Sequence, residues 1–366
     1  MEIKVIQAAP EKRKTKPTDE AKLGFGKIFT DHFFTMPYHA GRSWHDPLIE
    51  PCRPLQLDPS AMCLHYAQEI FEGMKAYRGK DGAIFLFRPT ENIRRMNVSA
   101  ERLCMPQVDE NLFLEALTKL ILLEKDWIPH GSGTSLYIRP TMIATEPALG
   151  VHPANEYLFF IIMGPVGAYY PEGFSPTKIF VTEEYSRSAP GGTGYCKAGG
   201  NYAASLYASE IAKKMGYTQV LWLDSVERKY VEEVGTSNMF FVIGDELITA
   251  PLMGTILPGI TRDSVIRLAK SWGVKVVERR ISMDEVMGAI ADGALREAFA
   301  SGTAAIVSPI GLIYYRGREY PINERKTGSL TERLYNEILQ IQYGQKDDPF
   351  GWRIKIADGS EAQSFP

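Results

Sequence analysis

Hydrophobic residues recur along the chain with two different periods, and each period predicts a different kind of element. Apolar residues three and four positions apart predict amphipathic helices. Six segments follow this spacing: residues 90–100, 111–126, 202–215, 261–272, 283–291 and 330–343. Alternating or continuous apolar runs predict strands. These lie at residues 27–38, 83–87, 135–143, 157–163, 178–183, 219–223, 230–233, 238–243, 275–280 and 306–310.

The order of these elements bears on the fold class and the domain division. Helices and strands mix without a strict strand–helix–strand repeat, which favours α+β over a doubly wound sheet. Residues 157–163 are apolar throughout, so we expect burial on both faces. The next ten residues, 164–173, hold three glycines and two prolines and predict a break. We therefore divide the chain into a polar flexible arm, a small domain, an interdomain loop and a larger domain, at residues 1–22, 23–164, 165–175 and 176–366.

Composition narrows the class of protein. The 366 residues are long enough for two domains, and 45% hydrophobic with 23% charged residues is ordinary for a globular chain. A net charge of −3 gives no reason to expect nucleic acid or an acidic membrane surface as a partner. The chain has no apolar run long enough to span a membrane and no apolar secretory leader. The four cysteines form no C-x-x-C pair, so we expect free thiols, no metal site and a cytoplasmic location.

Lys197 is the first candidate for chemistry. It lies between two glycine-rich stretches, residues 191–194 and 199–200. Glycine lets the backbone pass close to other groups, and a lysine held there can be pressed against a flat ligand. Lysine also forms Schiff bases with carbonyl compounds. The alternative is a glycine-rich surface loop with one solvated lysine.

Two further turns have the features of anion sites. Residues 257–262 combine Pro-Gly with the start of a predicted helix, whose N–H groups attract anions. Residues 301–305 combine a glycine and a threonine with small alanines. Many helices begin after Pro-Gly without binding any ligand, so each turn alone is weak evidence.

Glu233 completes a pattern with these elements. A carboxylate beside a pyridine nitrogen keeps that nitrogen protonated, so the ring can withdraw electrons from a substrate carbon. One lysine, two anion-binding turns and this acid together suggest pyridoxal 5′-phosphate. The alternative is that Glu232 and Glu233 are one outward and one inward residue of an ordinary strand.

The chain resembles the branched-chain amino-acid aminotransferases, which are fold-type IV pyridoxal-phosphate enzymes. The resemblance runs from about Phe25 to the last predicted helix. Five segments carry it: residues 71–75, 191–202, 233–238, 257–262 and 301–304. The resemblance implies an α+β fold of two domains. The smaller N-terminal domain would be α/β, and the larger C-terminal domain a mixed sheet or pseudo-barrel that binds the cofactor.

The resemblance also implies roles for individual residues at the cofactor. Lys197 would be the catalytic residue, which holds the cofactor covalently and then moves a proton. Glu233 would pair with the pyridine nitrogen, and Tyr202 would donate to the ring hydroxyl oxygen. Arg95 would hold the phosphate. The remaining cofactor contacts would be Arg187, Thr236, Ile260, Thr261 and Thr303.

The implied substrate pocket is apolar, because it must accept Leu, Ile and Val. Its matching positions are Phe25, Tyr66, Phe71, Tyr137, Tyr169 and Val151, the last contributed by the partner chain of a homodimer. Arg139 would bind the γ-carboxylate of glutamate, and the backbone of Thr303 and Ala304 would bind the α-carboxylate. Any one aromatic residue, taken alone, is more often part of a core.

The implied function is reversible transfer of the amino group of L-Leu, L-Ile and L-Val to 2-oxoglutarate, with small amino acids and 2-oxo acids as partners. Two alternatives share the lysine and the phosphate turns: a D-amino-acid aminotransferase and an aminodeoxychorismate lyase. A third alternative, of a different class, is a cofactor-binding protein without turnover.

Overall fold

The computed structural model describes residues 1–167 and 173–358. Their contacts separate into two compact units. The first holds residues 1–167, 196–199 and 340–358, and the second holds 173–195 and 200–339. The sequence division had placed residues 196–199 and 340–358 in the second domain. They join the first unit for two reasons. Ala198 forms an isolated β-bridge with Ile70, and the last strand, residues 353–357, pairs with the strand at residues 84–87.

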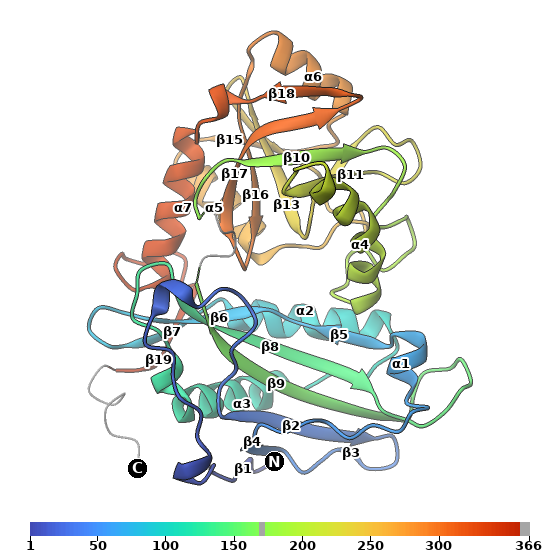
Figure 1. Ribbon diagram of the computed structural model, residues 1–366, viewed down its shortest axis with the longest axis vertical. Coiled ribbons are helices and arrows are strands. Elements are labelled where there is room, and N and C mark those ends of the chain that lie inside the picture. The colour runs from blue at the N-terminus through green and yellow to red at the C-terminus, as the bar shows by residue number, and fades with distance from the viewer. Residues whose placement is uncertain (168–172, 359–366) are drawn as a thin grey trace. The chain divides into compact units, whose positions relative to one another are not determined.

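The first unit is built on a ten-stranded sheet, in which β2, β9 and β8 run side by side (Figure 1). Its main strand order is β1-β4-β2-β9-β8-β6-β7-β19, with β3 on β2 and β5 on β8. The strands are β1 (Lys4–Val5), β2 (His32–His39), β3 (Ser43–Trp44), β4 (Leu48–Pro51), β5 (Glu69–Phe71), β6 (Met74–Arg78), β7 (Ile84–Phe87), β8 (Ser135–Ala144), β9 (Glu156–Val166) and β19 (Arg353–Ala357).

One face of this sheet carries the core of the first unit. Three helices belong to the unit: α1 (Met62–Tyr66), α2 (Pro89–Arg102) and α3 (Glu110–Leu123). Phe113 of α3 packs edge-on against Phe159 of β9, with ring centroids 4.8 Å apart. On the other face, Leu158, Phe160 and Ile162 are only half-buried. The expectation that residues 157–163 are buried on both faces is therefore wrong, because β9 is antiparallel to both neighbours and only one face is covered.

The N-terminal segment differs from the flexible arm that its polar composition predicted. Its strand β1 pairs in parallel with β4, and the side chain of Ile3 is 4% exposed. The backbone N–H of Lys14 donates to Asp31 at 2.7 Å. A few apolar residues and backbone hydrogen bonds therefore hold this segment against the first sheet, although most of its side chains are polar.

The second unit is built on a nine-stranded mixed sheet, part of which closes on itself. The strands β12, β11, β10, β17, β16 and β13 follow one another, and β13 pairs back with β12 to form a six-stranded barrel. The strands are β10 (Thr177–Thr182), β11 (Gln219–Leu223), β12 (Val231–Val234), β13 (Ser237–Ile243), β14 (Glu246–Thr249), β15 (Lys275–Glu278), β16 (Leu295–Gly302), β17 (Ile306–Tyr315) and β18 (Arg318–Pro321).

The barrel interior is the main core of the second unit. Each of its six strands contributes inward apolar side chains to one buried cluster, among them Ile179, Leu221, Val234, Met239, Ala298 and Ile313. The helix α6 (Met283–Ala291) adds Met283 and Val286 to this cluster. These observations confirm the expected mixed pseudo-barrel and the α+β class.

The other helices of the second unit lie outside the barrel interior. They are α4 (Gly199–Lys214), α5 (Ile260–Ser271) and α7 (Ser329–Gln342). The helix α4 packs Ala208 and Ala212 against Trp222 of β11. All six helices that the sequence predicted are present, and each end lies within three residues of its predicted position.

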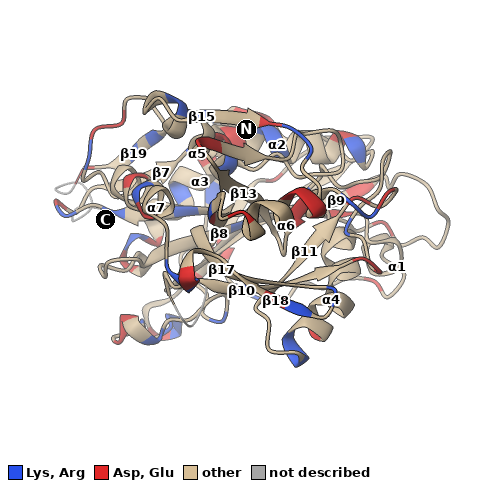
Figure 2. Ribbon diagram, turned by 90° about the horizontal axis from the view of Figure 1, so that it is seen from above, with Lys and Arg blue, Asp and Glu red and all other residues tan. Residues whose placement is uncertain are grey.

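The distribution of charged residues and the hydropathy of the helices agree with the composition of the chain. Basic and acidic residues are interspersed along the described chain (Figure 2). No helix within residues 1–167 and 173–358 is both long and apolar enough to cross a membrane.

Candidate functional site

Lys197 is anchored in the first unit by its backbone. Its N–H donates to the hydroxyl of Ser99 on α2 at 3.0 Å, and its carbonyl accepts from the N–H of Phe71 at 3.0 Å. The hydroxyl of Ser99 in turn donates to the carbonyl of Arg95. The segment around Lys197 is therefore fixed to both a strand end and a helix, and Lys197 is half-buried. Both observations disagree with the alternative of a surface loop with one solvated lysine.

Aromatic side chains gather beside the amine of Lys197. Its Nζ lies 4.9 Å from the ring centroid of Phe71, and the guanidinium carbon of Arg139 lies 4.6 Å from the same centroid. Tyr137 packs edge-on against Phe25, with ring centroids 4.9 Å apart. The structure thus brings together five of the predicted site residues: Phe25, Phe71, Tyr137, Arg139 and Lys197.

Tyr137 and Arg139 form the polar part of this group. The guanidinium Nη2 of Arg139 donates to the hydroxyl of Tyr137 at 2.9 Å. Gly73 is required beside them, because a Cβ at that position would overlap the hydroxyl of Tyr137. The Nε of Arg139 is buried and has no hydrogen-bond partner among the described residues. A buried donor of this kind fits an anionic ligand group.

Arg95 is held by a buried carboxylate. Its Nε and Nη2 donate to the two oxygens of Glu72 at 2.7 and 2.9 Å, and Asn92 donates to one of those oxygens at 2.8 Å. The side chain of Glu72 is fully buried. Burial by itself would raise the pKa of the Glu72 carboxyl. The charges of Arg95 and Lys197, with hydrogen bonds from Arg95 and Asn92, outweigh burial and hold that pKa below its ordinary value.

The Glu72–Arg95 pair gives the first testable prediction. Glu72→Gln removes the carboxylate that pairs with the buried guanidinium of Arg95, so we expect the free energy of unfolding to fall by about 3 kcal/mol or more. Chemical denaturation followed by circular dichroism measures this change. The matched control is Glu91→Gln, which removes an exposed ion pair with Arg94 on the same helix and should cost about 1 kcal/mol or less. Equal losses in the two variants would contradict a stabilising role for Glu72.

Glu233 lies at the centre of a group of buried polar residues in the second unit. It is 2% exposed, and one of its oxygens lies 2.6 Å from Nη1 of Arg187. It faces the same side of the barrel wall as Asn238 and Ser301, because these residues are direct partners across β12, β13 and β16. The three side chains form a buried polar row, which the interpretation of Glu233 as an ordinary strand residue does not explain.

The start of α5 adjoins this row. Gly259 is the N-cap of α5, and a Cβ there would overlap the amide oxygen of Asn238. Asn238 also donates to the carbonyl of Leu257 at 2.9 Å, which fixes the turn before the helix. Thr261 in the first turn is buried, and the hydroxyl of Ser301 is buried without a hydrogen-bond partner in the described part of the chain. A helix N-terminus beside an unsatisfied hydroxyl suits a phosphate group, so the residues present fit pyridoxal phosphate.

The structure also places the other predicted site residues. Arg187 is buried in the second unit. Four other predicted site residues of that unit are half-buried: Tyr202, Ile260, Thr303 and Ala304. Thr236 is exposed in the turn between β12 and β13. In the first unit Tyr66 is 37% exposed and Val151 is 85% exposed. Tyr169 lies outside the described residues.

Several residues around these groups were not predicted as site residues. Glu72, Asn238 and Ser301 lie in the segments that carried the family resemblance. Asn238 and Ser301 are polar residues in otherwise apolar strands, and Glu72 lies between two strands, β5 and β6. The apolar strand pattern was the signal that could have identified Asn238 and Ser301. Lys75 of β6 is a further polar residue that was not predicted as part of the site. Burial lowers the pKa of its amine to about 8. Ser99 gave no such signal, because a serine inside a helix is common.

The family model for amino-transferase class IV matches residues 69–313, which is more than half of the chain. The chain belongs to the class IV aminotransferases. This aminotransferase is therefore a transferase of amino groups, and its relatives agree. It is 50% identical over 351 residues to branched-chain-amino-acid aminotransferase 2 of Bacillus subtilis, covering 96% of each chain. It is 52% identical over 344 residues to branched-chain-amino-acid transaminase 1 of the same organism, covering 94% of this chain and 96% of the relative.

Solved structures show the same fold. The aminotransferase superposes on the branched-chain amino acid aminotransferase of Escherichia coli with a TM-score of 0.74 at 27% identity, covering 89% of this chain and 99% of that one. It superposes on the T.th. branched-chain amino acid aminotransferase with pyridoxamine 5′-phosphate with a TM-score of 0.73 at 28% identity, covering 88% and 98%. These likenesses confirm the fold-type IV architecture.

Proposed function

We propose that this aminotransferase transfers the amino group of L-Leu, L-Ile and L-Val to 2-oxoglutarate, reversibly. The observation that carries the proposal is the group beside Lys197, in which an aromatic wall of Phe25, Phe71 and Tyr137 adjoins the cation Arg139. An apolar wall accepts branched aliphatic side chains, and a guanidinium accepts the second carboxylate of glutamate. The names of the relatives that are about 50% identical support the same assignment.

The proposed cofactor is pyridoxal 5′-phosphate. When bound, it withdraws electrons from the substrate Cα, so that a proton there can be removed. Lys197 would hold the cofactor covalently and move the proton to and from the substrate. Glu233 would keep a proton on the pyridine nitrogen. The other proposed contacts are Arg95, Arg187, Tyr202, Thr236, Ile260, Thr261 and Thr303. The presence of pyridoxamine 5′-phosphate in a related structure supports the choice of cofactor.

The proposed substrate contacts divide by chemistry. Arg139 would bind the γ-carboxylate of glutamate, since its buried Nε has a donor to offer. The backbone at Thr303 and Ala304 would bind the α-carboxylate. Apolar contacts would come from Phe25, Tyr66, Phe71, Tyr137, Tyr169 and, across a homodimer, Val151 of the partner subunit.

A homodimer in the cytoplasm is the proposed working form. Exposed apolar side chains support the dimer, because Leu149 is 65% exposed and Val151 is 85% exposed on the connection between β8 and β9. None of the four cysteines forms a disulfide, which agrees with a reducing compartment.

A half-reaction assay with a panel of amino acids tests the proposal. We expect L-Leu, L-Ile, L-Val and L-Glu to change the visible absorbance of the holoenzyme, and their D-enantiomers to leave it unchanged. Arg139→Met should lower kcat/KM for L-Glu at least about tenfold more than for L-Leu, because only glutamate has a second carboxylate. The variant keeps a side chain of similar length against Phe71.

Three results would contradict the proposal or the role of Arg139 in it. Turnover of D-amino acids in preference to L-amino acids would favour the D-amino-acid aminotransferase, and release of pyruvate from aminodeoxychorismate would favour the lyase. Equal losses for glutamate and leucine in Arg139→Met would mean that another residue reads the γ-carboxylate.

A further inference from the structure

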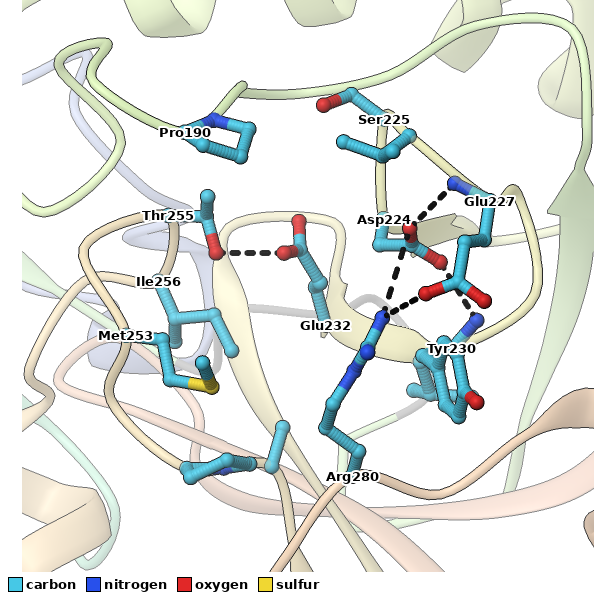
Figure 3. A pocket seen from close by; sticks show the side chains of 14 residues that line it. Pro190, Asp224, Ser225, Glu227, Tyr230, Glu232, Met253, Thr255, Ile256 and Arg280 are labelled. Carbon is cyan, nitrogen blue, oxygen red and sulfur yellow. Dashed lines mark hydrogen bonds and ion pairs between the residues drawn. The ribbon is translucent and has the colours of Figure 1, made fainter.

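The second unit contains a cavity of about 290 Å³ that the proposed function does not use. It opens between β12, the turn after β11 and the loop that ends at Ile256, and Figure 3 shows its labelled lining residues. All the residues that line it belong to the second unit. Its volume is near the lower end of the range for sites that hold small molecules.

One wall of the cavity carries an excess of negative charge. Asp224, Glu227 and Glu232 contribute three carboxylates, against the single guanidinium of Arg280. Arg280 is already paired, because its Nη2 lies 2.9 Å from Glu227 and 3.8 Å from Asp224 (Figure 3). Its guanidinium also stacks on the ring of Tyr230, 3.5 Å from the centroid. Arg280 is therefore held as a structural partner of two of the acids.

Glu232 is the carboxylate that remains for a ligand. Asp224 accepts hydrogen bonds from the backbone N–H groups of residues 227, 229 and 230, so its oxygens are used by its own turn. Glu232 accepts a hydrogen bond from the hydroxyl of Thr255 at 2.5 Å (Figure 3). A carboxylate has about four acceptor positions. Burial raises the pKa of the Glu232 carboxyl, which indicates that its charge is incompletely compensated in this structure.

The remaining wall of the cavity is apolar and open to solvent. Val226 is 73% exposed and Met253 is 69% exposed. Pro190, Pro251 and Ile256 complete this wall. Large apolar side chains gathered at the rim of a cavity expose surface that the body of a ligand would cover.

We propose that this cavity binds a small organic ammonium ion with a short aliphatic body. The N–H⁺ group donates to the carboxylate of Glu232, and the aliphatic body lies on Val226 and Met253. A ligand with a net negative charge is disfavoured because three carboxylates face the space and Arg280 is already engaged by two of them. The ammonium group can belong to a free amine or to a zwitterionic amino acid, and the test separates these sources.

Thr255, which lines the cavity, also binds Arg187, the ion-pair partner of Glu233. The carbonyl of Thr255 accepts hydrogen bonds from Nη1 of Arg187 at 3.2 Å and from the hydroxyl of Ser188 at 2.6 Å. Arg187 is the ion-pair partner of Glu233. The residue that binds Glu232 through its hydroxyl thus holds Arg187 through its carbonyl, on the same short loop.

Isothermal titration calorimetry of the holoenzyme tests the proposal. The probe is N,N-dimethyl-3-methylbutylamine, a tertiary amine that cannot condense with an aldehyde. We expect saturable binding with a Kd of about 1 mM, and a loss of about tenfold in affinity in Glu232→Gln, because a charge-assisted hydrogen bond is removed. The matched control is Glu285→Gln, whose carboxylate pairs with Arg279 outside the cavity and whose loss should leave binding unchanged.

A neutral analogue, a second variant and an amino-acid analogue complete the test. The neutral analogue 3-methylbutan-1-ol should not bind, and Met253→Lys should abolish binding of the amine through an exposed position that tolerates substitution. Tighter binding of N,N-dimethyl-L-leucine than of the amine would assign the site to amino acids, and weaker binding would assign it to free amines. Absence of saturable binding of the amine, or unchanged binding in both Glu232→Gln and Met253→Lys, would overturn the proposal.

Discussion

Replacing Lys197 by alanine should lower the rate of transamination by at least ~10⁴-fold, the upper end of what a positioned acid or base contributes. Alanine removes both the nucleophile and the group that moves the proton at the substrate Cα. The backbone contacts of residue 197, with Ser99 and Phe71, involve only main-chain atoms of the lysine and remain in the variant. The fold of the first unit should therefore be preserved, so that the loss reports chemistry. Single-turnover kinetics with L-Leu measure it.

A second measurement identifies the covalent link itself. Borohydride treatment of the holoenzyme followed by peptide mass spectrometry should find the cofactor attached to Lys197, and no attachment in Lys197→Ala. Lys197→Arg is the matched control, because arginine keeps a positive charge near Phe71 but is not a nucleophile of the same kind. It should be as inactive as the alanine variant. Activity within about tenfold of the wild type in either variant would refute the assignment.

Replacing Glu233 by glutamine should slow removal of the Cα proton by about 10²- to 10³-fold, which is the size of losing one preorganised electrostatic partner. An amide cannot keep a proton on the pyridine nitrogen as a carboxylate does. Because proton removal becomes slower than the other steps, the kinetic isotope effect with α-deuterated leucine should rise. Retention of the cofactor should change little, since the proposed phosphate contacts are on other residues.

The neighbouring residue supplies the control for this prediction. Glu232 belongs to the same strand but lines the separate cavity. In Glu232→Gln the amide oxygen can still accept from the hydroxyl of Thr255, so the loop that supports Arg187 is kept and the isotope effect should be unchanged. Glu233→Gln also leaves the buried Arg187 without its carboxylate, so a lower unfolding midpoint is expected in this variant alone. A normal rate and isotope effect in Glu233→Gln would exclude the proposed role at the ring nitrogen.

Elements with a clear hydrophobic period could be predicted from the sequence alone. The helix α6 begins and ends at the predicted residues, Met283 and Ala291, because its apolar period is strong and Ser282 accepts a hydrogen bond from Glu285 at its start. Lys197 and Glu233 were also recognisable, since each stands in a segment whose residue types suit one kind of chemistry.

Features that depend on distant partners could not be predicted in the same way. Hydrophobic period does not specify which strand a segment pairs with, so the sequence placed residues 340–358 in the second domain, although β19 pairs with β7 of the first unit. The N-terminal segment differs from its predicted form for the same reason. Its polar composition predicted an arm, whereas its backbone pairs with β4.

The sequence by itself determined the class of fold and the family, and it supplied the residues that we propose to carry the chemistry, because these depend on local residue types and their spacing. Tertiary structure alone decided how those residues are held. Glu72 binds Arg95 from 23 positions away along the chain, and Glu233 forms an ion pair with Arg187 from a distant loop. Strand pairing places Glu233 opposite Asn238, and Asn238 opposite Ser301. Such contacts follow from the register between strands and from packing across a core, and no period along one segment encodes them.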